Sequence, residues 1–197
     1  MKIKQVFDAS VQLSSLQRYS MTKLVNPESV LEHQGSVALM GILIGMKLNS
    51  FGESYNIGEI AIKAAIHDLD EIGTGDIPRP TKYNNEQLMS LLDGMAADSV
   101  DSFFNGIGVD GHGLWKAAKE NQSGSIVGLC DGLAVLCKVQ QEVCLFGNKL
   151  ILSHAGPIEE MLRAKFHLAK VYCQTVDGAD FLCDLESESK LMVEELV

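Results

Sequence analysis

The sequence contains few aromatic residues. Phe, Trp and Tyr make up 6% of its 197 residues, whereas Leu, Val, Ile, Ala and Met are plentiful. Since β-sandwiches draw heavily on aromatic side chains, this bias favours helices packed on helices. Apolar residues form 46% of the chain, enough for a sizeable core. We therefore expect one all-α domain over residues 1–197.

Positive charge is also scarce. Sixteen Lys and Arg residues stand against 26 Asp and Glu residues, which gives a net charge of −10, and the basic residues do not cluster. A protein that binds polymeric nucleic acid needs a basic surface that releases counterions, so we expect no such partner. A small anionic ligand is compatible with the composition, because one pocket can be positive on an acidic protein.

Cysteine pairs and long apolar segments are missing as well. The five cysteines are odd in number and form no CxxC motif, so neither a zinc knuckle nor a disulfide framework is indicated. We expect them to be small apolar residues of a reduced interior. The N-terminal segment has no apolar signal core, and the apolar run 37–46 is too short to span a bilayer. These features predict a cytoplasmic protein without a membrane partner.

Helical periodicity recurs along most of the chain. It predicts helices over residues 2–17, 27–48, 56–71, 84–104, 114–120, 125–146 and 158–176, and a peripheral helix or partly ordered tail within 184–197. The sequence Asn26-Pro27-Glu28 has the capping residue, the proline and the acid of a helix start. Gly41 and Gly45 are one turn apart and would permit close approach of a second helix. Residues 73–80 form a loop, because two glycines and two prolines cannot continue a helix.

Three polar features interrupt the apolar helices. His33 lies near the start of one helix, the pair His67-Asp68 ends another, and Asp131 lies within the apolar run 126–136. An ionised carboxylate in such a run is costly unless it is paired or binds a cation. Each feature alone has an ordinary structural explanation, such as a capping histidine or a hydrogen-bonded aspartate. Together, two imidazoles and two carboxylates suit a divalent transition-metal ion.

The order His…His-Asp…Asp resembles that of the HD phosphohydrolase superfamily, an all-helical fold. The strings Arg18-Tyr19, Glu32-His33, His67 to Glu71, Thr74 to Pro78 and Lys82-Tyr83 are similar to those of bacterial 5′-deoxynucleotidases and of related small phage enzymes that remove triphosphate from dATP. This resemblance covers residues 16–140. It implies that the chain is a single HD-domain helical bundle.

The resemblance also implies a metal centre. One divalent ion (Co, Mn, Zn, Mg or Fe) would be held by His33, His67, Asp68 and Asp131. Glu71 and Asp68 are the expected catalytic residues. In the family, the acid at the position of Glu71 orients the attacking water or protonates the leaving oxygen. From spacing alone, Glu71 could equally be a solvated acid at a helix end.

Five further residues match substrate-binding positions of the family. Arg18 and Lys82 would hold phosphate oxygens. Asp76 would face the sugar and accept a hydrogen bond from its 3′-hydroxyl group. Tyr19, which stands where these relatives usually have Trp, would stack on the base, and Met21 would complete the base pocket.

These residues predict a hydrolase that acts on the 5′-phosphate of 2′-deoxynucleotides. It would release either orthophosphate from a monophosphate or triphosphate from a triphosphate, and the ligand set does not distinguish the two. Two alternatives are an HD hydrolase of another phosphorylated metabolite, such as an alarmone, and a non-catalytic nucleotide-binding module. Relatives are often dimers or larger, so we expect a homodimer or higher homo-oligomer.

Overall fold

A computed structural model describes residues 3–77, 85–105 and 107–196. Over these residues the chain is helical and forms no strand, apart from an isolated bridge between Gln17 and Ser29. This confirms the all-α prediction. The elements are α1 (Ile3–Ser15), α2 (Val30–Ser50), α3 (Ile57–Ile66), α4 (Glu71–Thr74), α6 (Glu86–Phe104), α7 (Gly111–Lys116), α8 (Asn121–Gln140), the π-helical turn η1 (Gln141–Leu145), the 3-10 helix η2 (Lys149–His154), α9 (Ala155–Val171) and α10 (Val176–Glu194).

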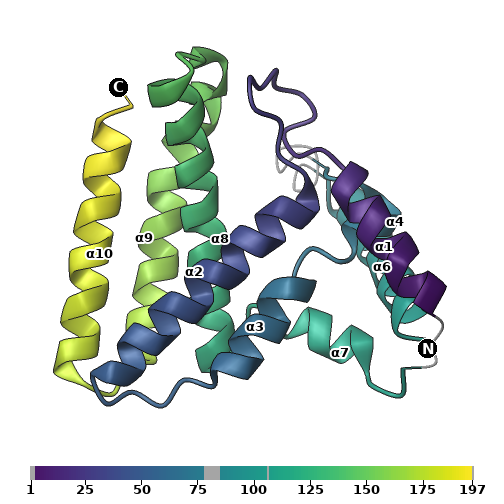
Figure 1. Ribbon diagram of the computed structural model, residues 1–197, viewed down its shortest axis with the longest axis horizontal. Helices are drawn as coiled ribbons and strands as arrows, with labels where there is room; N and C mark the ends of the chain where they lie inside the picture. Colours follow the sequence, from purple (N-terminus) through teal and green to yellow (C-terminus); the bar gives the residue numbers. More distant parts are fainter. Residues whose placement is uncertain (1–2, 78–84, 106, 197) are drawn as a thin grey trace.

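The helices form two groups (Figure 1). Helices α8, α9 and α10 stand side by side, and α2 crosses α8 with α3 packed against both. Helices α1, α4 and α6 lie together on the other side, and α7 contacts both α3 and α6. The main core lies where α2, α3 and α8 meet, and α9 and α10 extend it. The predicted site residues come from the elements that surround this meeting point.

Helix α2 begins later than the sequence predicted. A start at Pro27 is wrong, because Ser29 is the N-cap and Val30 the first helical residue. The Ser29 side chain accepts from the Glu32 N–H group at 3.2 Å, and the Glu32 carboxylate accepts from the Ser29 N–H group at 2.7 Å. This reciprocal capping box satisfies the N–H groups of Ser29 and Glu32 at the helix start.

Gly41 and Gly45 allow α3 to pack closely on α2, as predicted. A Cβ atom at Gly41 would lie 2.9 Å from Ile60 Cγ2, and one at Gly45 would lie 2.8 Å from Ile60 Cδ1. Carbon atoms do not approach so closely without a shift, so larger residues at either glycine would push α3 outwards. The two glycines therefore set the spacing between the helices that carry the predicted histidines.

Helix α3 ends at Ile66, five residues earlier than predicted. The His67 Nδ1 atom lies 2.7 Å from the carbonyl oxygen of Ala64, the group that a continuing helix would pair with the Asp68 N–H group. The Leu69 N–H group then bonds to Ile66 O, which forms a tighter turn. His67 and Asp68 consequently lie in a turn between α3 and α4 rather than inside one helix.

Helix α8 is the central element of the bundle. The stretch Asn121–Leu145 is long and apolar enough to cross a membrane, but 78% of an apolar 18-residue window within it is buried inside the protein, as in the core helix of a bundle. Of the cysteines spaced along it, Cys130 is buried and Cys137 and Cys144 are exposed, so the interior prediction is right only for the first.

Helix α10 begins at Val176 and packs along α9. It is longer than the predicted C-terminal helix, which was expected to start near residue 186. Leu182 and Leu196 are both buried in the main core. Residues 184–196 therefore contribute apolar contacts to the bundle.

A buried glutamate ties the segment before α2 to the end of α8. Glu142 is fully buried and accepts from the N–H groups of Val25 at 2.8 Å and Asn26 at 2.9 Å, and from the Asn148 side chain at 2.7 Å. Lys138 pairs with it at 3.2 Å. Burial disfavours its charged form, but these hydrogen bonds outweigh burial and lower the pKa of Glu142 to about 2.

Glu142→Gln should destabilise the fold, because it leaves the Lys138 charge buried without its partner. We expect the free energy of unfolding at pH 7, measured with urea, to fall by about 3 kcal/mol. Because the folded-state pKa lies below the unfolded value, this difference should be full above pH 4.5 and narrow as the pH falls towards 2. Glu160→Gln, at an exposed position on α9, is the control. Equal stability of the two variants would contradict the prediction.

Candidate active site

Four of the predicted residues converge where α2, α3 and α8 meet. His33 lies in the first turns of α2, His67 and Asp68 follow the last residue of α3, and Asp131 lies in the middle of α8. These helices are in mutual contact. The local causes are the capping box, which sets the phase of α2, and the turn that ends α3 at Ile66.

The ligand atoms of these residues face one another. His33 Nε2 lies 3.2 Å from Asp131 Oδ1 and 3.7 Å from Asp68 Oδ2. His67 Nε2 lies 3.1 Å from Asp68 Oδ2 and 4.0 Å from Asp131 Oδ1. Ligand atoms of His33, His67 and Asp68 all lie within 4.8 Å of one another, a group that could hold a metal ion. The distances place Asp131 Oδ1 beside the same group.

The two imidazoles direct their Nε2 atoms at the carboxylates. A carbonyl oxygen can only accept, so the contact of His67 Nδ1 with Ala64 O places a proton on Nδ1 and leaves Nε2 as the nitrogen that faces Asp68. Burial lowers the pKa of His33, which favours the neutral ring. Imidazole nitrogens held in this way are suited to bind a transition-metal ion.

The two carboxylates are ionised. Burial opposes the charge on Asp68, but the contact with His67 and the nearby Lys119 outweigh it and hold the pKa of Asp68 well below its usual range. Burial likewise opposes the charge on Asp131, and Lys119, His33 and Lys165 together depress its pKa. Two imidazoles and two anionic oxygens make a donor set suited to one divalent ion.

Cationic side chains surround these carboxylates. Arg18 is 12% exposed, and its guanidinium lies 3.1 Å from Asp68 Oδ2 and 3.4 Å from Glu28 Oε2. Lys119 and Lys165 lie 2.8 Å and 3.4 Å from Asp131 Oδ2. Arg18 was predicted from the sequence, whereas neither lysine was. Neither lysine belongs to a recognisable motif, and Lys165 lies beyond residue 140, so only the packing of α9 on α8 reveals it.

Glu71 begins α4, directly after the turn that carries Asp68. Its Oε2 atom is buried and has no hydrogen-bond partner in the described part of the chain. Burial, together with the negative charges of Asp68 and Asp76, raises the pKa of Glu71 to about 9. The carboxyl group therefore holds a proton at neutral pH and can donate it.

The other predicted substrate residues lie at different depths. Asp76 Oδ2 accepts from the backbone N–H group of Tyr19 at 2.9 Å, and Tyr19 has a left-handed backbone conformation with φ of 59°. Such conformations are uncommon for bulky residues and often mark functional sites. The Tyr19 ring packs partly against the core, whereas Met21 is 82% exposed. Lys82 lies outside the described residues.

Comparison with known protein families shows which family this chain belongs to. The model described as 5′-deoxynucleotidase YfbR-like matches residues 5–176. The chain belongs to the YfbR-like family. It is 29% identical to a 5′-deoxynucleotidase of Klebsiella pneumoniae over 192 residues, which covers 91% of this chain and 92% of that one. It is 28% identical to the 5′-deoxynucleotidase YfbR of Escherichia coli over 203 residues, covering 96% and 98% of the two chains.

Solved structures share the fold of this YfbR-like chain. The PH0347 protein of Pyrococcus horikoshii superimposes with a TM-score of 0.70 at 19% identity, covering 97% of this chain and 99% of that one. An HD-domain phosphohydrolase of Listeria innocua gives 0.63 at 20%, with coverage of 97% and 99%. The cyanophage S-2L HD phosphohydrolase DatZ, bound to dA and one catalytic Zn²⁺ ion, gives 0.63 at 16%, with coverage of 95% and 96%. The YfbR-like chain therefore has the HD fold.

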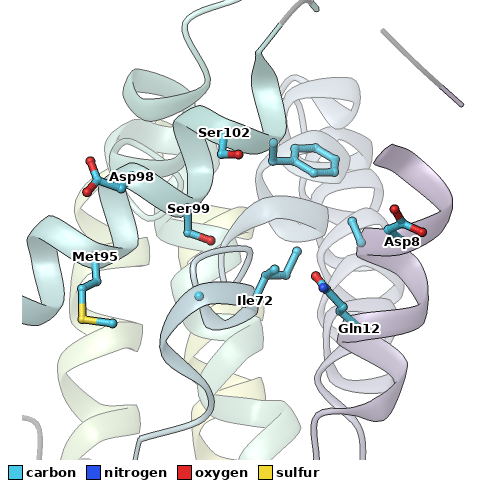
Figure 2. A pocket seen from close by; sticks show the side chains of 10 residues that line it. Asp8, Gln12, Ile72, Met95, Asp98, Ser99 and Ser102 are labelled. Carbon is cyan, nitrogen blue, oxygen red and sulfur yellow. The ribbon is translucent and has the colours of Figure 1, made fainter. Parts of the chain in front are cut away.

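The YfbR-like fold also has a surface hollow apart from the metal-ligand group. It has a volume of 490 Å³ and lies between α1, α4 and α6. Figure 2 shows Asp8 and Gln12 on one side, Ile72 at its base, and Met95, Asp98, Ser99 and Ser102 along α6. None of the predicted site residues that the structure describes lines it. The proposed chemistry therefore concerns the group of His33, His67, Asp68 and Asp131, which lies apart from this hollow.

Proposed function

We propose that this protein is a metal-dependent 5′-deoxynucleotidase, which releases orthophosphate from deoxynucleoside monophosphates. The observation that carries the proposal is the convergence of two imidazoles and two ionised carboxylates from three helices. Family membership supports the reaction class, because the matching family and the curated relatives carry the name 5′-deoxynucleotidase. A non-catalytic module would be expected to lack a ligand or the catalytic acid, and this chain has both.

The proposed ligands are His33, His67, Asp68 and Asp131, with one divalent ion among Co, Mn, Zn, Mg and Fe. Zinc has the support of the DatZ structure, which holds one catalytic Zn²⁺ ion in a related fold. Such an ion, when bound, lowers the pKa of a coordinated water and polarises the phosphoryl group. Asp68 also orients the site, because its Oδ2 atom meets His67 and Arg18 together.

Glu71 is the proposed general acid. When the phosphorus–oxygen ester bond breaks, the departing 5′-oxygen of the nucleoside needs a proton. The raised pKa of Glu71 means that its carboxyl group can supply one at neutral pH. Glu71 is the first residue of α4, three residues after Asp68, and its carboxyl group interacts electrostatically with Asp68 and Arg18, which supports this role.

Arg18 is the proposed phosphate-binding residue. Its guanidinium already lies at 3.1 Å from Asp68, so an anion that enters beside this carboxylate meets a positive group in place. A guanidinium matches phosphate geometry through two parallel hydrogen bonds and stabilises the charge that develops during transfer. Lys82 is proposed as a second phosphate contact from the sequence resemblance.

The sugar and base would lie towards Asp76, Tyr19 and Met21. The bond from the Tyr19 N–H group orients the Asp76 carboxylate, and a carboxylate can accept further hydrogen bonds, here from a 3′-hydroxyl. The exposed Met21 would contact the base at the mouth of the site. We also propose that the protein acts in the cytoplasm as a homodimer or larger homo-oligomer, which light scattering coupled to size-exclusion chromatography measures.

The reaction is tested by product analysis. We expect purified protein with Co²⁺, Mn²⁺, Zn²⁺ or Mg²⁺ to release orthophosphate from dAMP and the other deoxynucleoside monophosphates, and to act more slowly on AMP. Chromatography of the products also detects triphosphate released from dATP. If triphosphate were the main product, the protein would be a triphosphohydrolase rather than a monophosphatase. If only an alarmone were cleaved, the proposal of a deoxynucleotide substrate would be wrong.

Removing one proposed ligand should remove metal and turnover together. We expect His67→Ala and Asp131→Ala each to lose most of the metal bound by the wild type, measured by mass spectrometry of the desalted protein, and to show no detectable turnover. His167→Ala, at an exposed position on α9, should keep both. Full metal content in both ligand variants would refute the ligand assignment.

Removing the proposed acid should separate metal binding from chemistry. Glu71→Gln keeps the size of the side chain and loses the proton, so we expect wild-type metal content and a kcat lowered about 100-fold or more. The measurement is kcat at saturating metal and substrate. A kcat within threefold of the wild type would show that Glu71 does not transfer the proton.

A further inference from the structure

The two oxygens of Asp131 face different groups. Oδ1 lies 3.2 Å from His33 Nε2, on the side of the proposed metal ligands. Oδ2 lies 2.8 Å from Lys119 Nζ and 3.4 Å from Lys165 Nζ. A carboxylate can rotate about its bond to Cβ, so something must keep Oδ1 on the side of the histidines. The cations on Oδ2 are the groups that can do so.

The two lysines are held in different ways. Lys119 has a side chain that is 41% exposed, and among the described residues its ammonium meets two carboxylates of the site, Asp131 and, at 4.0 Å, Asp68. Lys165 is 19% exposed, and its ammonium also donates to the carbonyl oxygen of Gly128 at 2.6 Å. This oxygen belongs to the backbone of α8. The position of Lys165 is therefore fixed by a group outside the metal-ligand set.

Gly132 lets Lys165 reach Asp131 across α8. A Cβ atom at Gly132 would lie 3.0 Å from Lys165 Cδ and 2.9 Å from Leu162 Cδ2, so these side chains of α9 would have to shift, whereas one at Gly128 would lie 3.8 Å from Lys165 Nζ, an ordinary contact distance. Glycine weakens the interior of a helix, so the presence of Gly132 next to Asp131 needs a packing reason. The passage of the Lys165 side chain supplies one. We call the gap at Gly132 the glycine notch.

We propose that Lys165 is a positioning residue for the metal centre. Anchored on Gly128 O and threaded through the glycine notch, it holds Asp131 Oδ2 so that Oδ1 faces His33 and His67. The inference rests on the metal centre of the proposed function. Groups that hold a metal-ligating carboxylate in place commonly change metal affinity by 10- to 100-fold when they are removed.

The first test compares Lys165→Met with wild type and with Lys170→Met. Methionine keeps the apolar stem and removes the ammonium. Lys170 lies on the same helix and pairs with Glu186 at 2.7 Å, so it is a matched control. We expect Co²⁺ affinity, measured by competition with a chelating dye, to fall about tenfold in Lys165→Met and to stay unchanged in Lys170→Met. The visible absorption of bound Co²⁺ should change only in Lys165→Met.

The second test links Lys165 to the glycine notch. Gly132→Ala adds a methyl group that displaces the end of Lys165 and should weaken Co²⁺ binding in the wild-type background. In the Lys165→Met background the same substitution should add little, because the group it displaces has already gone. Non-additivity of this kind measures the coupling of two neighbouring residues. Fully additive effects on affinity would overturn the proposed route.

Each remaining result has a definite meaning. A Lys165→Met protein that is less thermally stable but binds Co²⁺ within twofold of the wild type would make Lys165 merely structural. Tighter binding would show that Lys165 acts by charge repulsion rather than by positioning. Either result overturns the inference and leaves the metal centre standing. A wild-type protein that binds no divalent ion would instead remove the metal centre itself, before any variant is compared.

Discussion

The structure depends on placing two ionised carboxylates inside a helical bundle. Asp68 and Asp131 would be too costly to bury as isolated charges. They are surrounded by three cationic side chains, Arg18, Lys119 and Lys165. The Nε2 atoms of two imidazoles also lie beside them. The same neighbours lower the free-energy cost of placing these charges in the bundle and keep both carboxylates deprotonated. A partly buried, deprotonated pair of carboxylates beside two imidazoles is the electrostatic condition for binding a divalent cation.

The glycines of α2 and α8 serve this condition from two sides. On α2, Gly41 and Gly45 bring α3 close, which sets how near His67 can lie to His33. On α8, Gly132 leaves room for a lysine from α9. In both helices a missing side chain is what lets a neighbouring element come close. The small residues of this core thus determine the geometry of its polar centre.

Most of the candidate site could be predicted from the order of its His and Asp residues along the sequence. His33, the His67-Asp68 pair and Asp131 stood out because they interrupt apolar helices, whereas their assignment as ligands and the role of Glu71 followed from the family resemblance. Helix ends were predicted less well. Helix α2 starts at Val30 rather than at Pro27, because Ser29 and Glu32 form a capping box and Asn26 has no acid three residues later to form one. Helix α3 ends at Ile66, because the His67 ring bonds to the carbonyl oxygen of Ala64. Both causes are side-chain bonds that compete with backbone periodicity.

Lys119 and Lys165 show the limit of sequence reasoning more sharply. A lysine on a helix is ordinarily solvated, and nothing in the residues around Lys165 distinguishes it from Lys170, five positions later on the same helix. The difference lies in the facing helix. Lys165 meets Gly128 O and Asp131, whereas Lys170 meets Glu186 of α10. Such a role depends on which helices pack together and at what rotation, so it can be recognised only when α8 and α9 are seen in contact.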